Sequence, residues 1–570
     1  MNDKLNNLVK LSKQRYKEEL TSVEQKLLKA IVTGEFADYQ VKSPEVTLLK
    51  EQLDLELLKE QLKKLDDVEN LEYLEDLDLE KLKELEKSEH PEQLKQLLAA
   101  IAKEKEFNNP ATAETWGEKR ILSAKFIEWL CTDVEAFKYF TNHGLQVCGA
   151  KISGELNLEF VKFESLFYFT ECVFTEKIIL RGAKVEEIKF DGSHVVGIDA
   201  ELIEVRGSLY LHNSFQSQGE VDLSGATIGG QIDCIKGHFS NPEGDALFAE
   251  SMEVKADVFL RNGFKAEGRV SLSGSTIGGQ LSCSGGHFSN KEGDALNAKN
   301  IEVKESVFLS NDFKAEGRVS LSGATIGLLD CSDGHFSNSE GDALFADNIK
   351  VKADVFLRES FKAEGRVSLS GANIGGQLDC SDGHFSNSEG DALNIQNIEV
   401  KGSVFLGDYF KAEGRVILLE ATIGGQLNCS DGHFSNPQRD ALVAQSIEVK
   451  GHVFLREGFE AEGEVSLSGA IISGQLDCSN GHFSNQQGDA LNIQNIEVKA
   501  DVILKNGFQA EGRVSLYGAT IGGQLDCSDG YFSNKEGDAL FAESIKVQSG
   551  VLLKNGFQAE GRVSLYGATI

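Results

Sequence analysis

The sequence predicts a mainly β protein, a right-handed parallel β-helix solenoid, with an α-helical N-terminal region. Three observations lead to this prediction: a tandem repeat of 49 residues, apolar side chains spaced two residues apart within it, and glycine-containing turns between them. A constant period of this size is typical of repeat architectures. The segment V-x-L opens each copy, at Val221, Val270, Val319, Val367, Val416, Val465, Val514 and Val563.

Each repeat contains two copies of one template. From Val270 the apolar residues fall at offsets 0, 2, 5, 7, 11, 13 and 18, and from Leu296 they fall at 0, 2, 5, 7, 11, 13 and 17. Pairs at i and i+2 are typical of short strands with one face inward. Turns are expected at Ser273–Gly274, at Gly278–Gly279 and at the polar segment Ser289–Asp294. Three strands per coil and right-handed crossovers then predict about 18 rungs, two per repeat.

The predicted β-helix covers residues 141–570, and its regular repeats start at 221. Residues 1–140 are expected to be helical and to cap the first edge of the array, because a solenoid needs terminal cover. Thr21 and Glu24 form a capping-box pattern before a helix that ends at Gly34. A further amphipathic helix is predicted over Trp116–Phe137.

Residues 41–106 form a Leu/Glu-rich insert within this N-terminal region. Its leucines recur at three- and four-residue steps, for example at Leu58, Leu62 and Leu65, which is helical periodicity. We expect a surface helical hairpin with solvated charges. A partner-binding coiled coil is the alternative, although the heptads are irregular.

Composition limits the classes of function. The net charge of −33 argues against direct binding to nucleic-acid phosphates, which requires a basic face. The N-terminus has no apolar segment typical of a secretory signal, and no run of about 18 apolar residues occurs. A cytoplasmic location follows as the expectation, with the cytoplasmic face of the inner membrane as the alternative.

Stacked coils would align equivalent positions into columns, and one column consists of cysteines. Its members are two rungs apart, roughly 9 to 10 Å, which is too far for a disulfide or for a shared metal ion. We interpret them as buried thiols that fill the core, and we predict no metal and no cofactor. The column comprises Cys234, Cys283, Cys331, Cys380, Cys429, Cys478 and Cys527.

Three charged columns are expected on the outer surface. The histidines lie one residue before an inward Phe, at His238, His287, His335, His384, His433 and His482. The aspartates form an acidic column at Asp245, Asp294, Asp342, Asp391, Asp440, Asp489 and Asp538, where calcium binding is the alternative although the Gly-rich nonapeptide calcium repeat is not matched. The arginines, at Arg269, Arg318, Arg366, Arg415, Arg513 and Arg562, are expected to pair with Glu267, Glu316, Glu364, Glu413, Glu511 and Glu560.

Catalysis on a β-helix requires a local break in the repeat where acids, bases or cations cluster. The visible departures are a missing residue in Ile326–Asp330, Leu419–Glu420 in place of Ser-Gly, Arg439 in place of Gly, and Glu464 in place of Arg. In sequence these positions do not assemble a nucleophile with a base or a pair of carboxylates. We therefore predict no catalytic residues and no enzyme.

The repeat resembles a family of bacterial tandem-repeat proteins that are loosely labelled membrane-associated oxidoreductase or pentapeptide-repeat-like. The resemblance lies in the G-x-V-x-L-x-G-A-x-I-G-G-Q-L-x-C block, the following V-F-L-x-x-x-F, the segment Leu20–Asp38 and Trp116–Leu130. It covers most of the chain except the insert at 41–106. The resemblance implies that longer members continue into a C-terminal membrane-spanning region that this chain lacks, and membrane association is expected only through such a region. Nucleotide motifs and paired redox cysteines, which an oxidoreductase would need, are not found.

The leading expectation for function is a non-catalytic scaffold that presents repeated polar columns to a protein partner. One alternative is an acidic nucleic-acid mimic that regulates a DNA-binding protein. Another is a carbohydrate-active β-helix enzyme. The last repeat is incomplete at Ile570. Either an open rung there lets copies stack end to end, or the chain is a fragment of a longer protein.

Overall fold

A computed structural model describes residues 2–17, 19–44, 46–48 and 92–570. The protein is mainly β, a parallel β-solenoid of about 18 turns, with few helices that lie mostly near the N-terminus. The chain divides into two compact units, residues 1–219 and 220–570, and each is described by itself. The predicted fold class is confirmed.

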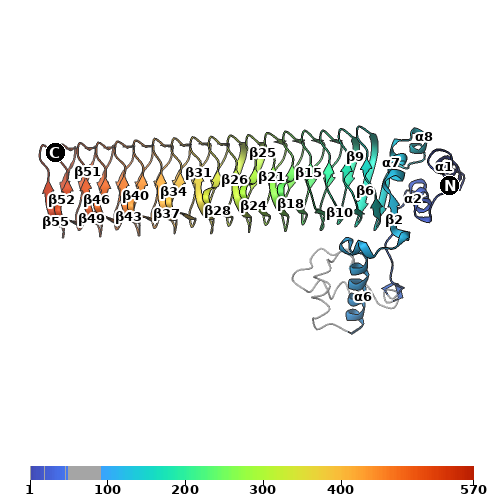
Figure 1. Cartoon of the computed structure of the whole chain (residues 1–570). Coiled ribbons are helices and arrows are strands. Elements are labelled where there is room, and N and C mark those ends of the chain that lie inside the picture. Colours follow the sequence, from blue (N-terminus) through green and yellow to red (C-terminus); the bar gives the residue numbers. More distant parts are fainter. Residues whose placement is uncertain (1, 18, 45, 49–91) are drawn as a thin grey trace. The chain divides into compact units, whose positions relative to one another are not determined.

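Most coils of the second unit contribute three strands to two parallel sheets, and in the coils of β25 (Glu302–Phe308) and β27 (Thr325–Asp330) the two first-sheet strands are joined into one (Figure 1). In one coil, β22 (Thr276–Ile277) and β23 (Leu281–Ser282) belong to the first sheet, and β24 (His287–Asn297) belongs to the second. Each of these strands pairs in parallel with its equivalents in the coils before and after it. The predicted pattern of three strands per coil is therefore present, since the inward residues follow the two-residue period.

After β15 (Val221–Asp222), the second sheet of this unit alternates 11-residue and 7-residue strands. The 11-residue strands are β18 (His238–Phe248), β24, β28 (His335–Phe345), β34 (His384–Asn394), β40 (His433–Val443), β46 (His482–Asn492) and β52 (Tyr531–Phe541). The 7-residue strands are β21 (Lys265–Ser271), β26 (Lys314–Ser320), β31 (Lys362–Ser368), β37 (Lys411–Ile417), β43 (Glu460–Ser466), β49 (Gln509–Ser515) and β55 (Gln558–Ser564). The first sheet uses two- and three-residue strands, apart from the longer β25 (Glu302–Phe308) and β27 (Thr325–Asp330).

The turn expected at Ser289–Asp294 is instead a bulge inside one continuous strand. Pairing between β24 and β26 shifts register between Ser289 and Asp294, so the extra residues project from the sheet. Asn290 Nδ2 donates a hydrogen bond to the Asp294 carbonyl at 2.9 Å and closes the bulge. Opposite it, Gly317 has φ +118°, and a Cβ there would lie 2.1 Å from the Asn290 oxygen, so the neighbouring coil requires glycine.

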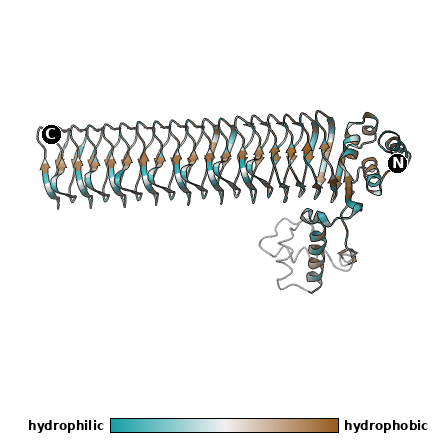
Figure 2. Ribbon diagram, in the orientation of Figure 1, coloured by the Kyte–Doolittle hydropathy of each residue, from teal (hydrophilic) through white to brown (hydrophobic). Residues whose placement is uncertain are grey.

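A column of phenylalanine rings fills the core of the second unit. Neighbouring rings have centroids 5.0 to 5.4 Å apart and are buried except at Phe557, which is partly exposed. Phe288 is in register with Ala315, although its ring stacks on the ring of Phe313. The rings of alternate coils therefore start from backbone positions that are not aligned, and they still meet in one stack. The column comprises Phe239, Phe264, Phe288, Phe313, Phe336, Phe361, Phe385, Phe410, Phe434, Phe459, Phe483, Phe508, Phe532 and Phe557. Figure 2 shows hydrophobic and hydrophilic residues recurring from coil to coil.

In the first unit, the coils begin at β3 (Leu145–Cys148), and strands from the N-terminal region cover their edges. β1 (Ala37–Asp38) pairs with β3, and β2 (Ile121–Ser123) pairs with β4 (Lys151–Ser153), both in parallel. The remaining strands are β5 (Leu156–Asn157), β6 (Lys162–Thr170), β7 (Val173–Phe174), β8 (Ile178–Ile179), β9 (Lys184–Lys189), β10 (His194–Val195), β11 (Ile198–Asp199), β12 (Glu204–Val205), β13 (Leu209–Tyr210) and β14 (Gln216–Ser217). Edge backbone groups of β3 and β4 are thus paired as well as covered.

The helices around this edge agree only in part with the prediction. The helix α2 (Ser22–Thr33) has the predicted capping box at Thr21 and Glu24 and ends at Gly34 in the left-handed conformation. The single helix expected over Trp116–Phe137 is wrong, because pairing with β4 holds Ile121–Ser123 as a strand. Around β2 lie η3 (Glu118–Arg120), α7 (Ala124–Thr132) and α8 (Val134–Phe137), and α1 (Asn2–Arg15) precedes α2.

The two ends of the insert meet at one point. Asn108, the last residue of α6 (Glu92–Asn108), exchanges two hydrogen bonds with the Val41 backbone, at 2.9 and 3.0 Å. Arg120 donates to Asn108 at 3.1 Å and to the Gly149 carbonyl at 2.8 Å. The structure confirms that the C-terminal end of the insert is helical, since α6 begins at Glu92. The periodic leucines from Leu58 to Leu85, on which the predicted helical hairpin depends, lie outside the described residues.

Candidate interaction surface

The outer side of the second sheet in residues 220–570 carries a ladder of ion pairs between aspartate and arginine. We expected these arginines to pair with glutamates, and this expectation is wrong. The parallel register places each Arg beside the Asp of the preceding coil, because the bulge moves that Asp next to it. The pairs are Asp245–Arg269, Asp294–Arg318, Asp342–Arg366, Asp391–Arg415, Asp489–Arg513 and Asp538–Arg562.

These ion pairs are stronger than ordinary surface pairs because the aspartates are mostly shielded from solvent. The Asp245 side chain is 16% exposed, and Arg269 reaches both its oxygens, through Nε at 2.5 Å and Nη2 at 2.9 Å. Bidentate geometry of this kind fixes orientation as well as charge. Each pair therefore holds an 11-residue strand in register with the 7-residue strand of the next coil, and it occupies carboxylates that a calcium ion would need.

The glutamates form a second ladder two residues earlier on the 7-residue strands. Glu316 contacts His287 Nε2 at 3.4 Å and Lys291 Nζ at 3.2 Å, and its pKa is lowered, mainly by the hydrogen bond from Lys291. The same His–Glu contact recurs in other coils, for example between His238 and Glu267 at 3.3 Å. As predicted, the histidines lie at the surface, with side chains about 40% exposed.

One coil interrupts the Asp–Arg ladder. Asp440 is in register with Glu464, so two carboxylates stand where the other coils have an ion pair. Burial raises the pKa of Glu464, and the carboxylates of Asp440 and Asp489 add to the rise, while Asn492 Nδ2 donates to Glu464 at 3.0 Å. In sequence, Glu464 stands alone as a departure from the repeat. Only the coil register brings Asp440 beside it.

The cysteine column lies in the interior, as predicted. All seven side chains are fully buried, and the ten cysteines of the chain are free. Burial raises the pKa of each thiol in the column, for example at Cys283 and Cys429. A buried neutral thiol behaves as a small apolar side chain. These residues therefore contribute to packing.

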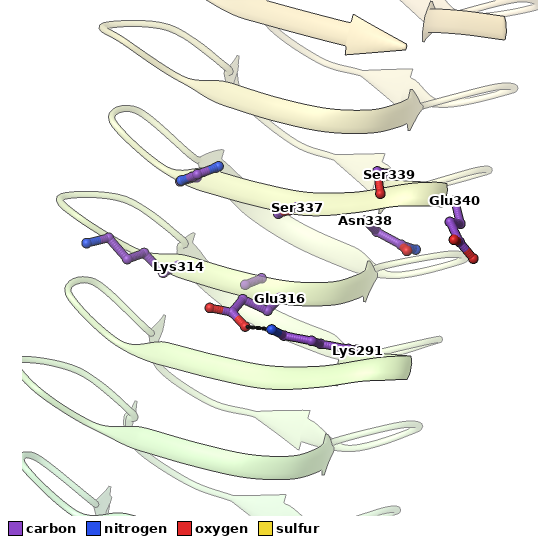
Figure 3. Close-up of a pocket in the computed structure, with 9 residues that line it drawn as sticks. Lys291, Lys314, Glu316, Ser337, Asn338, Ser339 and Glu340 are labelled. Atoms are coloured by element: carbon purple, nitrogen blue, oxygen red, sulfur yellow. Dashed lines mark ion pairs between the residues drawn. The ribbon is translucent and has the colours of Figure 1, made fainter. Parts of the chain in front are cut away.

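A hollow opens on the same outer face between two successive bulges (Figure 3). Its volume is about 560 Å³, and its floor is the 7-residue strand β26, which lacks a bulge. Lys291 from the first bulge and Ser339 and Glu340 from the second lie at its sides, and Lys314 and Glu316 rise from the floor. The lining is polar, so the hollow suits a charged or hydrogen-bonding ligand.

Sequence reasoning missed the Asn clamp of the bulge and the identity of the arginine partners. A usable signal was present, since Asp and Arg are separated by 24 residues in each pair, close to the length of one coil. Among the described residues, no helix is long and apolar enough to cross a membrane. Comparisons with protein-family models, curated proteins and solved structures found no match. The fold defines a β-solenoid repeat protein with a stacked phenylalanine ladder.

Proposed function

We propose that the protein is a non-catalytic scaffold whose outer second-sheet face binds a protein partner. The observation that carries this proposal is the regular repetition of the same polar groups on a backbone locked by ion pairs and bulge clamps. Such a face is preorganised, so little conformational entropy is lost when a partner binds. Solenoids generally offer extended surfaces of this kind.

Affinity capture from a lysate of the source cell would test the scaffold proposal. We expect one stoichiometric protein partner, and we expect its recovery to fall when the bulge is removed from β28 by shortening Asn338–Gly341. The matched control is the same shortening in β52, at Asn534–Gly537, which leaves the hollow intact. Recovery of no stoichiometric protein with the intact chain would contradict the proposal.

A second candidate is a carbohydrate-active enzyme, and one specific observation favours it. Asp440 and Glu464 are adjacent carboxylates, and the raised pKa of Glu464 suits a general acid, as glycoside hydrolysis requires. Incubation of the purified protein with a panel of polysaccharides, followed by a reducing-end assay, would test this. Cleavage that is lost in Glu464→Gln and retained in Glu462→Gln would replace the scaffold proposal.

The nucleic-acid-mimic alternative has less support, because arginines neutralise most of the aspartate ladder. We further propose that the protein belongs to the bacterial tandem-repeat family that its motifs resemble. We also propose a cytoplasmic location, which the free cysteines favour because thiols persist in a reducing compartment. Cell fractionation with an antibody against the chain would test the location. Recovery in a secreted fraction would contradict it.

A further inference from the structure

The hollow is part of a longer basic stripe on the same face. The first residue of each second-sheet strand is basic over nine successive coils, in which His and Lys alternate and lie in register. The stripe consists of His238, Lys265, His287, Lys314, His335, Lys362, His384, Lys411 and His433. It ends at Glu460, which takes the next place in the column. In a chain with a net charge of −33, this is a local exception.

Several lysines of the stripe are available to a ligand. Lys265, Lys314 and Lys411 are exposed and form no ion pair with any residue in the described part of the chain, whereas Lys362 pairs with Glu364 at 2.6 Å. At the hollow, Lys314 lies on the same floor as Glu316, whose charge Lys291 already balances at 3.2 Å. An unpaired ammonium group thus borders a polar space large enough for a side chain of a partner.

We infer that this stripe binds an extended acidic segment of a partner protein, with Lys314 in the hollow as the anchor for one of its carboxylates. This inference rests on the scaffold function proposed above and specifies the partner. The ligand chemistry is a peptide in the polyproline II conformation with an acidic residue at every third position.

The spacing of the lysines selects this conformation. Successive lysines are two strands apart, about 9.6 Å. A polyproline II helix advances about 3.1 Å per residue with three residues per turn, so every third side chain recurs after about 9.3 Å on one face. An extended β segment advances about 6.6 Å between side chains on one face, which does not match. Acidic residues at each third position would therefore meet Lys265, Lys314, Lys362 and Lys411 in turn.

The neighbouring glutamates argue against a densely charged polyanion as the ligand of the stripe. Glu267, Glu316, Glu364 and Glu413 lie two residues from the lysines on the same strands. A nucleic acid or a polyuronate carries charge continuously and would be repelled by this column. A peptide with spaced carboxylates places its charges at the lysines only. Its uncharged positions can lie over the serines and glutamates.

Fluorescence anisotropy with a labelled peptide that repeats Glu-Pro-Pro would test the inference on the full chain at neutral pH. We expect saturable binding that weakens with added salt, because exposed charges are screened. The triple substitution Lys265→Ala, Lys314→Ala and Lys411→Ala should weaken binding by about tenfold. The control triple Lys304→Ala, Lys352→Ala and Lys401→Ala removes the same charge from exposed lysines within or next to strands of the first sheet and should leave binding unchanged.

The substitution Glu460→Lys supplies a gain-of-function test, because it extends the stripe by one coil and should strengthen binding. Circular dichroism would verify that each variant folds. Equal weakening by both triples, or binding of polygalacturonate but not of the peptide, would overturn the inference. Capture of a protein partner equally by the intact chain and the stripe triple would also overturn it while sparing the scaffold proposal. Peptide binding without any captured partner would count against the scaffold alone.

Discussion

Removing one ring from the phenylalanine column should destabilise the solenoid more than any single surface change. Phe336 is fully buried between Phe313 and Phe361, with ring centroids at 5.1 and 5.3 Å. Replacing a buried Phe with Ala costs about 3–5 kcal/mol through lost burial and the cavity left behind. Two aromatic contacts, each contributing about 0.5–1.5 kcal/mol, move the expected cost of Phe336→Ala to the upper end of that range.

Phe557→Ala is the matched comparison within the same column. Its ring is partly exposed, and its recorded ring contact in the column is with Phe532 at 5.4 Å, so we expect a cost of about 1–2 kcal/mol. Guanidinium unfolding followed by circular dichroism would measure both free energies. Because a solenoid is stabilised by nearest-neighbour interfaces, Phe336→Ala should also split the unfolding curve into two transitions. Equal costs for the two variants, with one shared transition, would refute the reasoning that the rings couple the coils.

Three further predictions concern the ladder, a bulge and pH. Glu464→Arg should restore an ion pair with Asp440 and stabilise the protein by about 1 kcal/mol, measured by thermal unfolding; destabilisation would show that the carboxylate pair is favourable. Gly365→Ala should cost about 2 kcal/mol or more, because its φ is +121° and a Cβ would lie 2.2 Å from the Asn338 oxygen; a neutral result in the same assay would contradict the close approach. Burial lowers the pKa of His194 to about 4, so the unfolded chain binds a proton at this residue at higher pH than the folded chain does. The free energy of unfolding should therefore decline as pH falls from about 6.5 to 4. The variant His194→Gln should flatten that part of the pH profile, and an unchanged slope would contradict the assignment to His194.

Sequence reasoning found the charged columns of the outer face but not the ion pairs that they form. The histidine, aspartate and arginine columns were visible as repeating positions. The structure places the histidines at the surface, whereas the arginines cover most of each paired aspartate. Their partners were not visible, because a partner depends on which residue of the neighbouring coil stands alongside. The bulge in β24 shifts that register between Ser289 and Asp294, and this shift places Asp294 beside Arg318.

At the N-terminal edge, sequence periodicity predicted a helix where pairing with a neighbouring strand decides the structure. The helical periodicity of Trp116–Phe137 is real, yet Ile121–Ser123 forms a strand. Local propensity favours a helix by fractions of a kcal/mol per residue, whereas an unpaired strand edge leaves several backbone groups unsatisfied. Pairing of β2 with β4 therefore outweighs the local preference.

The sequence alone determined the repeat, the three strands per coil and the inward columns of Phe and Cys. These features depend on side-chain periodicity, which is a local property, and copies of the template reinforce it coil after coil. Only the tertiary structure decided which charges pair, where Asp440 stands beside Glu464, and where a hollow opens above β26. Those outcomes depend on the register between coils. The register is set by bulges and by the backbone contacts around them, and these involve residues that are distant in the chain.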